Sequence, residues 1–366
     1  MIKLGIFCNY GPFFSVGGSE FVIKNISDHL VKNFNYKINI YAYNYKKVYN
    51  YSDNIKLIPC FRGNNILTQV SQNDHIFIYS DSFWSLDALL KNIKLIDPGS
   101  SCALVGAYHL QSHPDILGIL KSNINKFNLI THSSITPDYK FCIDNDLPVK
   151  VLPNKVDLSE FKNNNIDFRR KYNIKEKYII INISNFFYGK GFEVLPKIYK
   201  KLSKKLDDFI ILQLSNTVEY PYDKQFLNKT KQQCNGMNIR FLRDLSREDV
   251  VLALKCSDLF LFTSKKEVAP LVILESKAAG IPYVSMDVGN IKEVKGGDII
   301  EHRLVDKKGY IVVDEQIIDD YVASIINLLK SEDYKSNIIK DVKNGIEKLD
   351  WKNVVPEYDK AFRNEA

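Results

Sequence analysis

Two glutamates, Glu267 and Glu275, bracket a short apolar segment of the chain. Before this segment, the apolar residues 258–262 predict a buried parallel strand. Residues 271–279 predict a helix that ends at Gly280, because glycine readily adopts the left-handed conformation common at helix ends. The two carboxylates therefore belong to a strand, loop and helix in direct succession.

Such a succession places both carboxylates near the carboxyl end of a strand, where open α/β sheets bind ligands. Glu267 lies in the loop and Glu275 about one turn inside the helix. Pro270 fits the first helical turn, where its missing N–H is no loss. Free N–H groups at a helix start attract phosphate, and carboxylates accept hydrogen bonds from hydroxyls. The loop therefore predicts a ligand that carries both phosphate and hydroxyl groups.

Two further glycine-containing turns follow predicted strands. Gly17 and Gly18 open the first helix, and Lys190 stands between Gly189 and Gly191 at the start of another. Neither matches a dinucleotide fingerprint or a Walker A loop. Taken alone, the first pair is more often a plain turn, and Lys190 suits a surface position as well as a phosphate site.

Apolar strands alternate with amphipathic segments in two successive series, which predicts doubly wound parallel sheets. A polar stretch at 154–165 is the expected linker. The expected strands are 3–7, 38–43, 55–58, 75–79, 102–107 and 129–132, then 179–183, 209–214, 239–241, 259–262, 283–286 and 310–312. The expected helices are 21–34, 192–205, 247–256, 272–279 and 316–330, with an aromatic docking helix at 350–365.

Composition supports a two-domain globular protein. The 366 residues exceed one typical core, and 45% are hydrophobic and 25% charged. No uninterrupted apolar run of membrane-spanning length and no signal-peptide pattern is present, so a cytoplasmic location is expected. The net charge of +7 suits solvated helix faces or attraction to an anionic membrane or acidic glycan. Nucleic-acid binding is not expected, because no basic stripe with interleaved aromatics occurs.

Short motifs follow one another along the whole chain. They are Gly17-Gly18-x-Glu20, residues 152–157 with Phe161, Lys190-Gly191, Ser264-x2-Glu267-x7-Glu275 with 279–282, Gly289-x3-Glu293 and the helix that contains Trp351. In order and spacing, they resemble the retaining glycosyltransferases of the family 4 type. The glutamate block is the most specific of them.

The resemblance implies an α/β fold of GT-B architecture, with two Rossmann-like doubly wound parallel-sheet domains facing across a cleft. Residues 1–155 would form the acceptor-side domain, 156–345 the nucleotide-sugar donor domain, and 346–366 a helix crossing back to the first domain. The implied enzyme transfers a sugar, with retention, from a nucleotide-diphosphate donor, expected to be a UDP- or GDP-sugar. The acceptor would be a hydroxyl of a glycan, lipid or small molecule. No cofactor or metal is implied, and peripheral association with the inner membrane surface is compatible.

The resemblance also implies roles for individual residues. Glu267 would hydrogen-bond to hydroxyls of the donor sugar, and Glu275 would bind the ribose. Lys190 would neutralise the diphosphate, and His109 would face the reacting sugar. The donor-binding set also includes Gly17, Gly18, Asn185, Pro270, the N–H groups of Leu271 and Val272, and Arg243 in the segment 241–244 near the base.

The chain departs from the family pattern at two positions. Asn185 stands where the family usually has an arginine, which removes one of two diphosphate cations. Lys155 replaces a glycine at the junction, so a turn with positive φ would be strained there. The loss of charge at Asn185 motivates a rival hypothesis, a non-catalytic sugar-nucleotide or glycan-binding partner of an active transferase. An epimerase or phosphorylase of similar architecture is a further alternative.

Other polar residues allow more than one interpretation. Asp81 suits acceptor contact or a helix cap equally well. His109 and His113 have metal-like spacing, but no acidic partner with suitable spacing accompanies them. The Asp-x-Asp at residues 144–146 is predicted to be a polar turn rather than a metal site.

Overall fold

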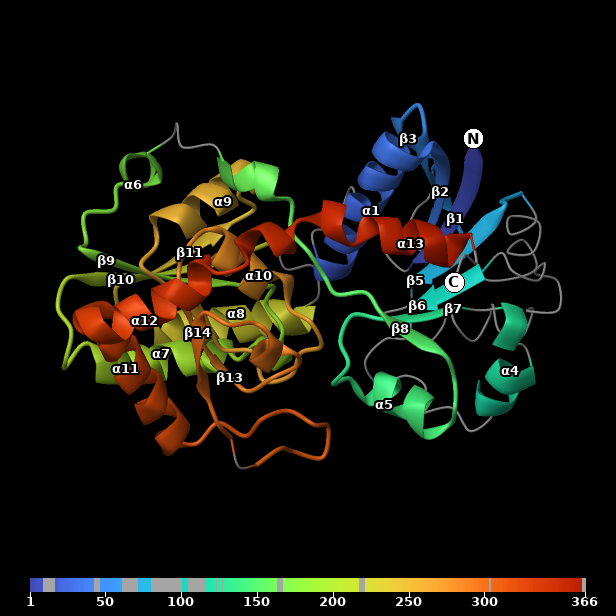
Figure 1. Ribbon diagram of the computed structural model, residues 1–366. Coiled ribbons are helices and arrows are strands. Elements are labelled where there is room, and N and C mark those ends of the chain that lie inside the picture. The colour runs from blue at the N-terminus through green and yellow to red at the C-terminus, as the bar shows by residue number, and fades with distance from the viewer. Residues whose placement is uncertain are drawn as a thin grey trace. The chain divides into compact units, whose positions relative to one another are not determined.

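The computed structural model describes two compact units. One unit comprises Met1–Lys155 and Trp351–Ala366, and the other comprises Val156–Asp350. Each unit has its own sheet of mainly parallel strands, flanked by helices (Figure 1). The described residues are 1–8, 17–42, 47–60, 72–79, 101–104, 116–122, 124–126, 128–162, 167–216, 221–302 and 304–363.

The first unit contains an eight-stranded sheet in the order β3-β4-β2-β1-β5-β6-β7-β8. All neighbouring strands pair parallel except β3, which runs antiparallel to β4 at the edge. The strands are β1 (Ile2–Cys8), β2 (Tyr36–Ala42), β3 (Tyr49–Ser52), β4 (Ile55–Pro59), β5 (His75–Tyr79), β6 (Ser101–Leu104), β7 (Asn128–Thr131) and β8 (Val149–Val151).

A C-terminal helix completes the core of this unit. Helix α13 (Val355–Phe362) contacts α1 (Gly18–Phe34), β5 and β6, so residues from the two ends of the chain lie side by side (Figure 1). The ring of Phe362 packs 5.1 Å from that of Phe77, between centroids. The Tyr36 hydroxyl donates a 2.7 Å hydrogen bond to Asp359. The remaining helices of the unit are α4 (Ile116–Ser122), α5 (Pro137–Asp144) and the 3-10 turns η3 (Ile124–Lys126) and η9 (Trp351–Asn353).

The second unit contains six parallel strands in the order β11-β10-β9-β12-β13-β14. This is the strand order of doubly wound nucleotide-binding folds, and it reverses between β9 and β12. The strands are β9 (Tyr178–Ile183), β10 (Phe209–Ser215), β11 (Ile239–Arg243), β12 (Leu259–Phe262), β13 (Tyr283–Met286) and β14 (Gly297–Ile300). The helices are α6 (Phe168–Lys171), α7 (Leu195–Leu202), α8 (Pro221–Gln233), α9 (Arg247–Cys256), α10 (Leu271–Ala278), α11 (Glu315–Lys330) and α12 (Glu332–Lys343). The 3-10 turns are η4 (Leu158–Lys162), η5 (Tyr188–Lys190), η6 (Phe192–Val194), η7 (Ile291–Glu293) and η8 (Ile346–Leu349).

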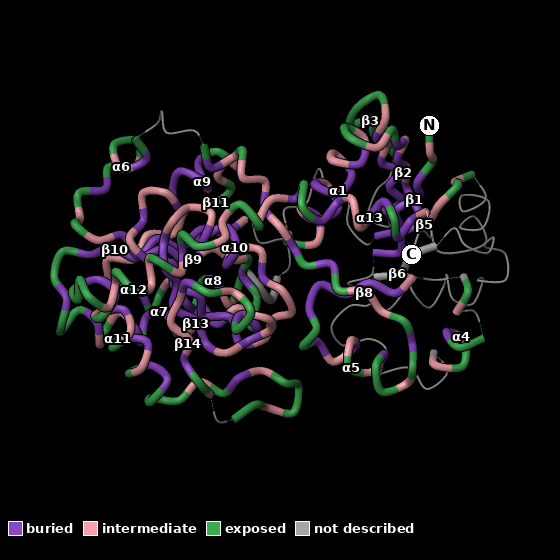
Figure 2. The backbone as a smooth tube through the Cα atoms, viewed as in Figure 1, coloured by how far each residue is buried: buried purple, intermediate pink, exposed green. Residues whose placement is uncertain are grey.

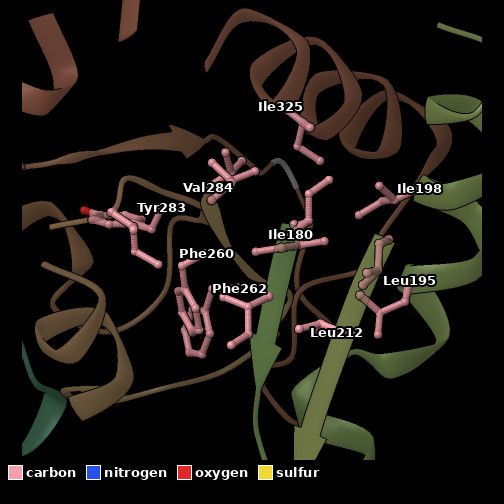
Figure 3. Packing of buried hydrophobic residues seen from close by; sticks show 14 of the residues in the cluster. Ile180, Leu195, Ile198, Leu212, Phe260, Phe262, Tyr283, Val284 and Ile325 are labelled. Carbon is pink, nitrogen blue, oxygen red and sulfur yellow. The ribbon is translucent and has the colours of Figure 1, made fainter. Parts of the chain in front are cut away.

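The central strands of this sheet are buried on both faces. Ile180 of β9, Leu212 of β10 and Phe260 of β12 are fully inaccessible to solvent. Ile198 of α7 and Ile325 of α11 contribute to the same core (Figure 3). Buried residues line the strands, whereas exposed residues lie on the outer helices and loops (Figure 2). This rigid core positions the loops that leave the carboxyl ends of β9 and β12.

Several predicted elements differ from the structure. The strand expected at 310–312 is wrong, because Ile311 forms only an isolated bridge with Val305. The helix expected at 192–205 begins as a 3-10 turn and ends at Leu202. Edge strand β3 was missed because all its residues are exposed, and α12 because Val342 is its only fully buried residue. β8, β14, α5 and α8 were also absent from the prediction.

The Tyr36–Asp359 hydrogen bond gives a stability prediction for the first unit. We expect Tyr36→Phe to lower the free energy of unfolding by about 1–2 kcal/mol, because the buried Asp359 carboxylate loses a donor. Burial and the Asp359 carboxylate both raise the pKa of Tyr36, so this donor is intact at neutral pH. Urea unfolding followed by tryptophan fluorescence measures the change, since both tryptophans belong to this unit's part of the sequence.

Tyr139→Phe is the matched control for that experiment. The side chain of Tyr139 is half-buried, and within the described chain its hydroxyl has no hydrogen-bond partner. We expect this variant to unfold within about 0.5 kcal/mol of the wild type. Equal effects of the two substitutions would contradict the assigned role of the Tyr36 bond.

Candidate functional site

The loops that leave β9 and β12 meet where the strand order of the second sheet reverses. Open α/β sheets bind ligands at this topological position, outside the carboxyl ends of the strands. The first loop leads to η5 and carries Lys190, and the second carries Glu267 and leads to α10. Both belong to the second unit.

Lys190 and Glu267 form an ion pair between the two loops. Lys190 Nζ lies 2.5 Å from Glu267 Oε1, and the two side chains are 21% and 12% exposed. Lys190 Nζ also lies 5.3 Å from the ring centroid of Phe187. Because both charges are largely shielded from water, their attraction is stronger than that of an exposed surface pair. The structure thus brings together two residues that the sequence predicted separately.

Glycine at position 191 allows the close approach of the two loops. Gly191 has φ +67°, and a Cβ there would lie 2.0 Å from the carbonyl oxygen of Thr263. Thr263 Oγ1 donates a 2.9 Å hydrogen bond to Lys190 O. Lys265 N donates to Gly189 O at 2.8 Å. These contacts hold the backbone at Lys190 against the end of β12.

Helix α10 presents free donors at its N-terminus. Pro270 is the N-cap in an extended conformation, one position before the first turn where it was expected, and no side chain caps the helix. Among the described residues, the N–H groups of Leu271 and Val272 have no hydrogen-bond partner. Gly280, with φ +82°, follows the helix end as predicted. This N-terminus is suited to an anionic group.

Glu275 is nearly inaccessible, at 5% exposure, and is bound to an arginine that the sequence analysis did not identify. Arg247 Nη2 lies 2.6 Å from Glu275 Oε1. The same guanidinium donates to Glu160 Oε2 from Nη2 at 2.7 Å and from Nε at 3.0 Å. Burial by itself lowers the pKa of Arg247. The nearby carboxylates of Glu275 and Glu160 raise it by more than burial lowers it, so the pKa of Arg247 lies above its ordinary value. The sequence feature that could have identified Arg247 is its position directly after Ser246, the residue that caps α9.

Asn185 follows β9 and Arg243 ends β11, two strands that lie on either side of β10. Asn185 Oδ1 accepts hydrogen bonds from Asn216, from Nδ2 at 3.2 Å and from the backbone N at 3.4 Å. Arg243 is the exposed last residue of β11. Asp244 follows it with φ +53°. A pair of neutral amides therefore occupies the position where the resembled family carries a cation.

The remaining predicted residues fall in the first unit. Gly17 is the N-cap of α1, and a Cβ at Gly17 would lie 2.2 Å from Glu20 Oε2. Gly18 is the first residue of that helix. Lys155 does not have positive φ, so the strain expected there is absent. His109, His113 and Asp81 lie outside the described residues.

The Asp-x-Asp segment ends a helix. Asp144 is the last residue of α5, Asn145 is its C-cap, and Asp146 has φ +57°. No cluster of three metal-ligating side chains occurs within the ranges that the structure describes. The segment thus has the geometry of the predicted turn.

The sequence is similar to known glycosyltransferases, mainly over the unit that contains this site. Residues 164–345 match the family model described as "Glycosyl transferases group 1". The N-acetyl-alpha-D-glucosaminyl L-malate synthase of Bacillus anthracis is 26% identical over 261 residues, or 69% of this chain and 64% of that protein. A phosphatidylinositol N-acetylglucosaminyltransferase GPI3 subunit of Saccharomyces cerevisiae is 21% identical over 67% of this chain and 50% of that protein. The chain thus spans less than two thirds of the length of these curated relatives.

Solved structures confirm the predicted fold class. Sucrose-phosphate synthase from Thermosynechococcus elongatus has a TM-score of 0.76 at 13% identity, covering 100% of this chain and 99% of that one. Anabaena Alr3699/HepE, crystallised in complex with UDP and glucose, also gives 0.76 at 13% identity, with 100% of both chains covered. The chain therefore has the two-domain, Rossmann-like GT-B fold. Among the described helices, none is long and apolar enough to span a membrane.

The contact at Gly191 gives a second stability prediction. We expect Gly191→Ala to lower the free energy of unfolding by about 3 kcal/mol or more, because the new Cβ would collide with the Thr263 carbonyl. Gly236→Ala is the matched control, since Gly236 has φ +76° but open space around it. It should cost only about 1 kcal/mol through its backbone conformation. Chemical denaturation of both variants measures the difference, and equal losses would refute the proposed close approach.

Proposed function

We propose that this protein is a metal-independent, retaining glycosyltransferase. It would transfer a sugar from a nucleotide-diphosphate donor to a hydroxyl of a glycan, lipid or small-molecule acceptor. The observation that carries the proposal is the shielded Lys190–Glu267 pair at the point where the strand order reverses. Such a position suits a ligand with phosphates for the cation and hydroxyls for the carboxylate.

The proposed chemistry separates a sugar from its diphosphate. The bond from the sugar's anomeric carbon to the diphosphate oxygen breaks, and negative charge grows on the leaving group. Lys190 and the free N–H groups of Leu271 and Val272 would stabilise this charge. Glu267 would accept hydrogen bonds from the sugar hydroxyls rather than act as a nucleophile. The acceptor oxygen would then bond to the same face of the carbon, and its proton would pass to the departing phosphate.

The similar proteins suggest which donors and acceptors should be tested first. One structural neighbour, Anabaena Alr3699/HepE, was crystallised both with UDP and glucose and with UDP-glucose, so UDP-sugars are the first donors to test, followed by GDP-sugars. The name of one sequence relative specifies phosphatidylinositol as an acceptor. We therefore include lipid acceptors, and a cytoplasmic site at the inner membrane surface, in the proposal.

A second candidate function follows from Asn185. Asn185 is a neutral amide whose side-chain oxygen accepts hydrogen bonds from Asn216, so this residue does not supply the cation that the resembled family carries at the same position. With half of the expected diphosphate charge missing, a protein that binds a sugar nucleotide without turnover is the alternative. Binding of UDP- or GDP-sugars without turnover, across a broad acceptor panel, would favour this function over catalysis.

The charged pair gives a direct test of the proposed activity. We expect Lys190→Gln to reduce donor turnover by about a hundredfold or more, because the leaving diphosphate loses its cation. Glu267→Gln should also reduce turnover, through weaker hydrogen bonding to the sugar. Lys197→Gln, on the exposed surface of α7, is the control and should leave turnover unchanged. Release of UDP or GDP measures all three, and wild-type rates in both site variants would refute the assignment.

A gain-of-function variant separates the two candidate functions. We expect Asn185→Arg to increase turnover in an active transferase, because a second cation would stabilise the leaving diphosphate. Asn216→Ala serves as its control, since this change removes the Nδ2 hydrogen bond to Asn185 without adding charge. Unchanged turnover in Asn185→Arg, with correct folding and donor binding, would show that the missing cation does not limit the reaction.

A further inference from the structure

Glu275 belongs to a group of three charged side chains from separate elements. Glu160 lies in η4, Arg247 begins α9, and Glu275 lies within α10. The guanidinium lies between the two carboxylates and contacts both at 2.6–2.7 Å. The side chains of Glu160 and Arg247 are 27% and 28% exposed, whereas that of Glu275 is 7% exposed. One cation therefore serves two anions, and the less accessible anion lies beside the proposed donor site.

The contacts of Glu275 leave one of its oxygens available. Arg247 engages Oε1, and among the described residues Oε2 has no side-chain or backbone donor. Glu275 Oε2 is not among the fully buried side-chain atoms that lack a partner, so it keeps some contact with solvent and can accept a hydrogen bond from water or a ligand. The three charges also carry a net negative charge, which suits hydroxyl donors and disfavours a second phosphate. The geometry therefore points to a hydroxyl-bearing part of the ligand.

The position of Glu275 along α10 identifies that part. The free N–H groups of Leu271 and Val272 mark the place of the diphosphate at the helix start. Glu275 lies about one turn further on, or about 5 Å along the axis. In a nucleoside diphosphate, the ribose is the hydroxyl-bearing group attached directly to the phosphates on the side away from the sugar. We expect a carboxylate at this distance to reach the 2′- and 3′-hydroxyls, which is the role that the family resemblance implies for Glu275.

We propose that Arg247, itself held by Glu160, is a positioning residue that fixes Glu275 for ribose recognition. This inference rests on the proposed function and deepens it by naming the residue that positions the ribose-binding carboxylate. Loss of this positioning should weaken the preference of the site for ribonucleoside diphosphates over their 2′-deoxy counterparts. Arg247 binds Glu160 through two nitrogens of its planar guanidinium, which fixes the direction in which Nη2 meets Glu275, whereas a lysine ammonium has no such fixed orientation.

The test compares UDP with 2′-deoxy-UDP, and GDP with 2′-deoxy-GDP, by calorimetry on the full chain. Wild-type protein should bind the ribonucleotide about tenfold or more tightly, as expected for hydrogen bonds to a carboxylate. In Arg247→Lys and Glu160→Gln, this ratio should fall to about twofold or less. Binding of inorganic pyrophosphate should stay within about twofold of wild type in both, because its site at Lys190 is intact. A merely structural role of Arg247 would weaken every ligand alike.

Matched controls keep the outcome decisive. Arg170→Lys on α6 and Glu248→Gln beside Arg247 change exposed residues of the same types and should preserve the full ratio. If Arg247→Lys fails to fold, the ratio measured with Glu160→Gln alone still tests the inference. A wild-type preference that survives in a folded Arg247→Lys or Glu160→Gln variant overturns the inference. Equal wild-type binding of UDP and 2′-deoxy-UDP overturns it as well, but leaves the proposed function standing. If no nucleoside diphosphate binds, the proposed function and this inference both fail.

Discussion

The candidate site depends on one steric constraint, the contact between the backbone at Gly191 and the carbonyl of Thr263. Parallel strands β9 and β12 bring their carboxyl ends together, but only a residue without a Cβ lets the following loops touch. The Thr263 hydroxyl then bonds to Lys190, and the lysine ammonium reaches Glu267. A charged pair largely shielded from water is thereby held by backbone geometry rather than by flexible side chains alone.

The second unit pairs each of its two motif glutamates with a cation from a different element. Glu267 is bound by a lysine that follows β9, and Glu275 by an arginine at the start of α9. A buried charge with a partner of opposite sign is less unfavourable than an isolated one, because the attraction between the two offsets part of the desolvation cost. This arrangement keeps two acceptors in place on either side of the free end of α10. Pre-organisation of this kind lowers the free-energy cost of ordering the site on binding.

Sequence patterns predicted the central elements of both units and the spacing of the motif residues. Strands buried on both faces have continuous apolar runs, so β9, β10 and β12 were found, whereas exposed β3 and polar α12 carry no such signal. Glu267 and Lys190 stood out because each lies in a loop after a strong strand. Arg247 and Glu160 did not, since an ion pair among three separate elements depends on tertiary packing rather than local spacing. The bonding of Asn185 to Asn216 likewise follows from the register of β9 and β10.

Because α13 belongs to the first unit, the whole second unit is inserted within the sequence of the first. During translation, the strands of the first sheet therefore leave the ribosome early. Helix α13, which belongs to the same unit, leaves it only after residues 156–350 have emerged. Until then, Phe77 and the face of α1 that α13 covers remain open to water and to chaperones. The inserted unit holds a contiguous core and can complete its folding first. Assembly of the first domain during synthesis is thus timed by the length of the second.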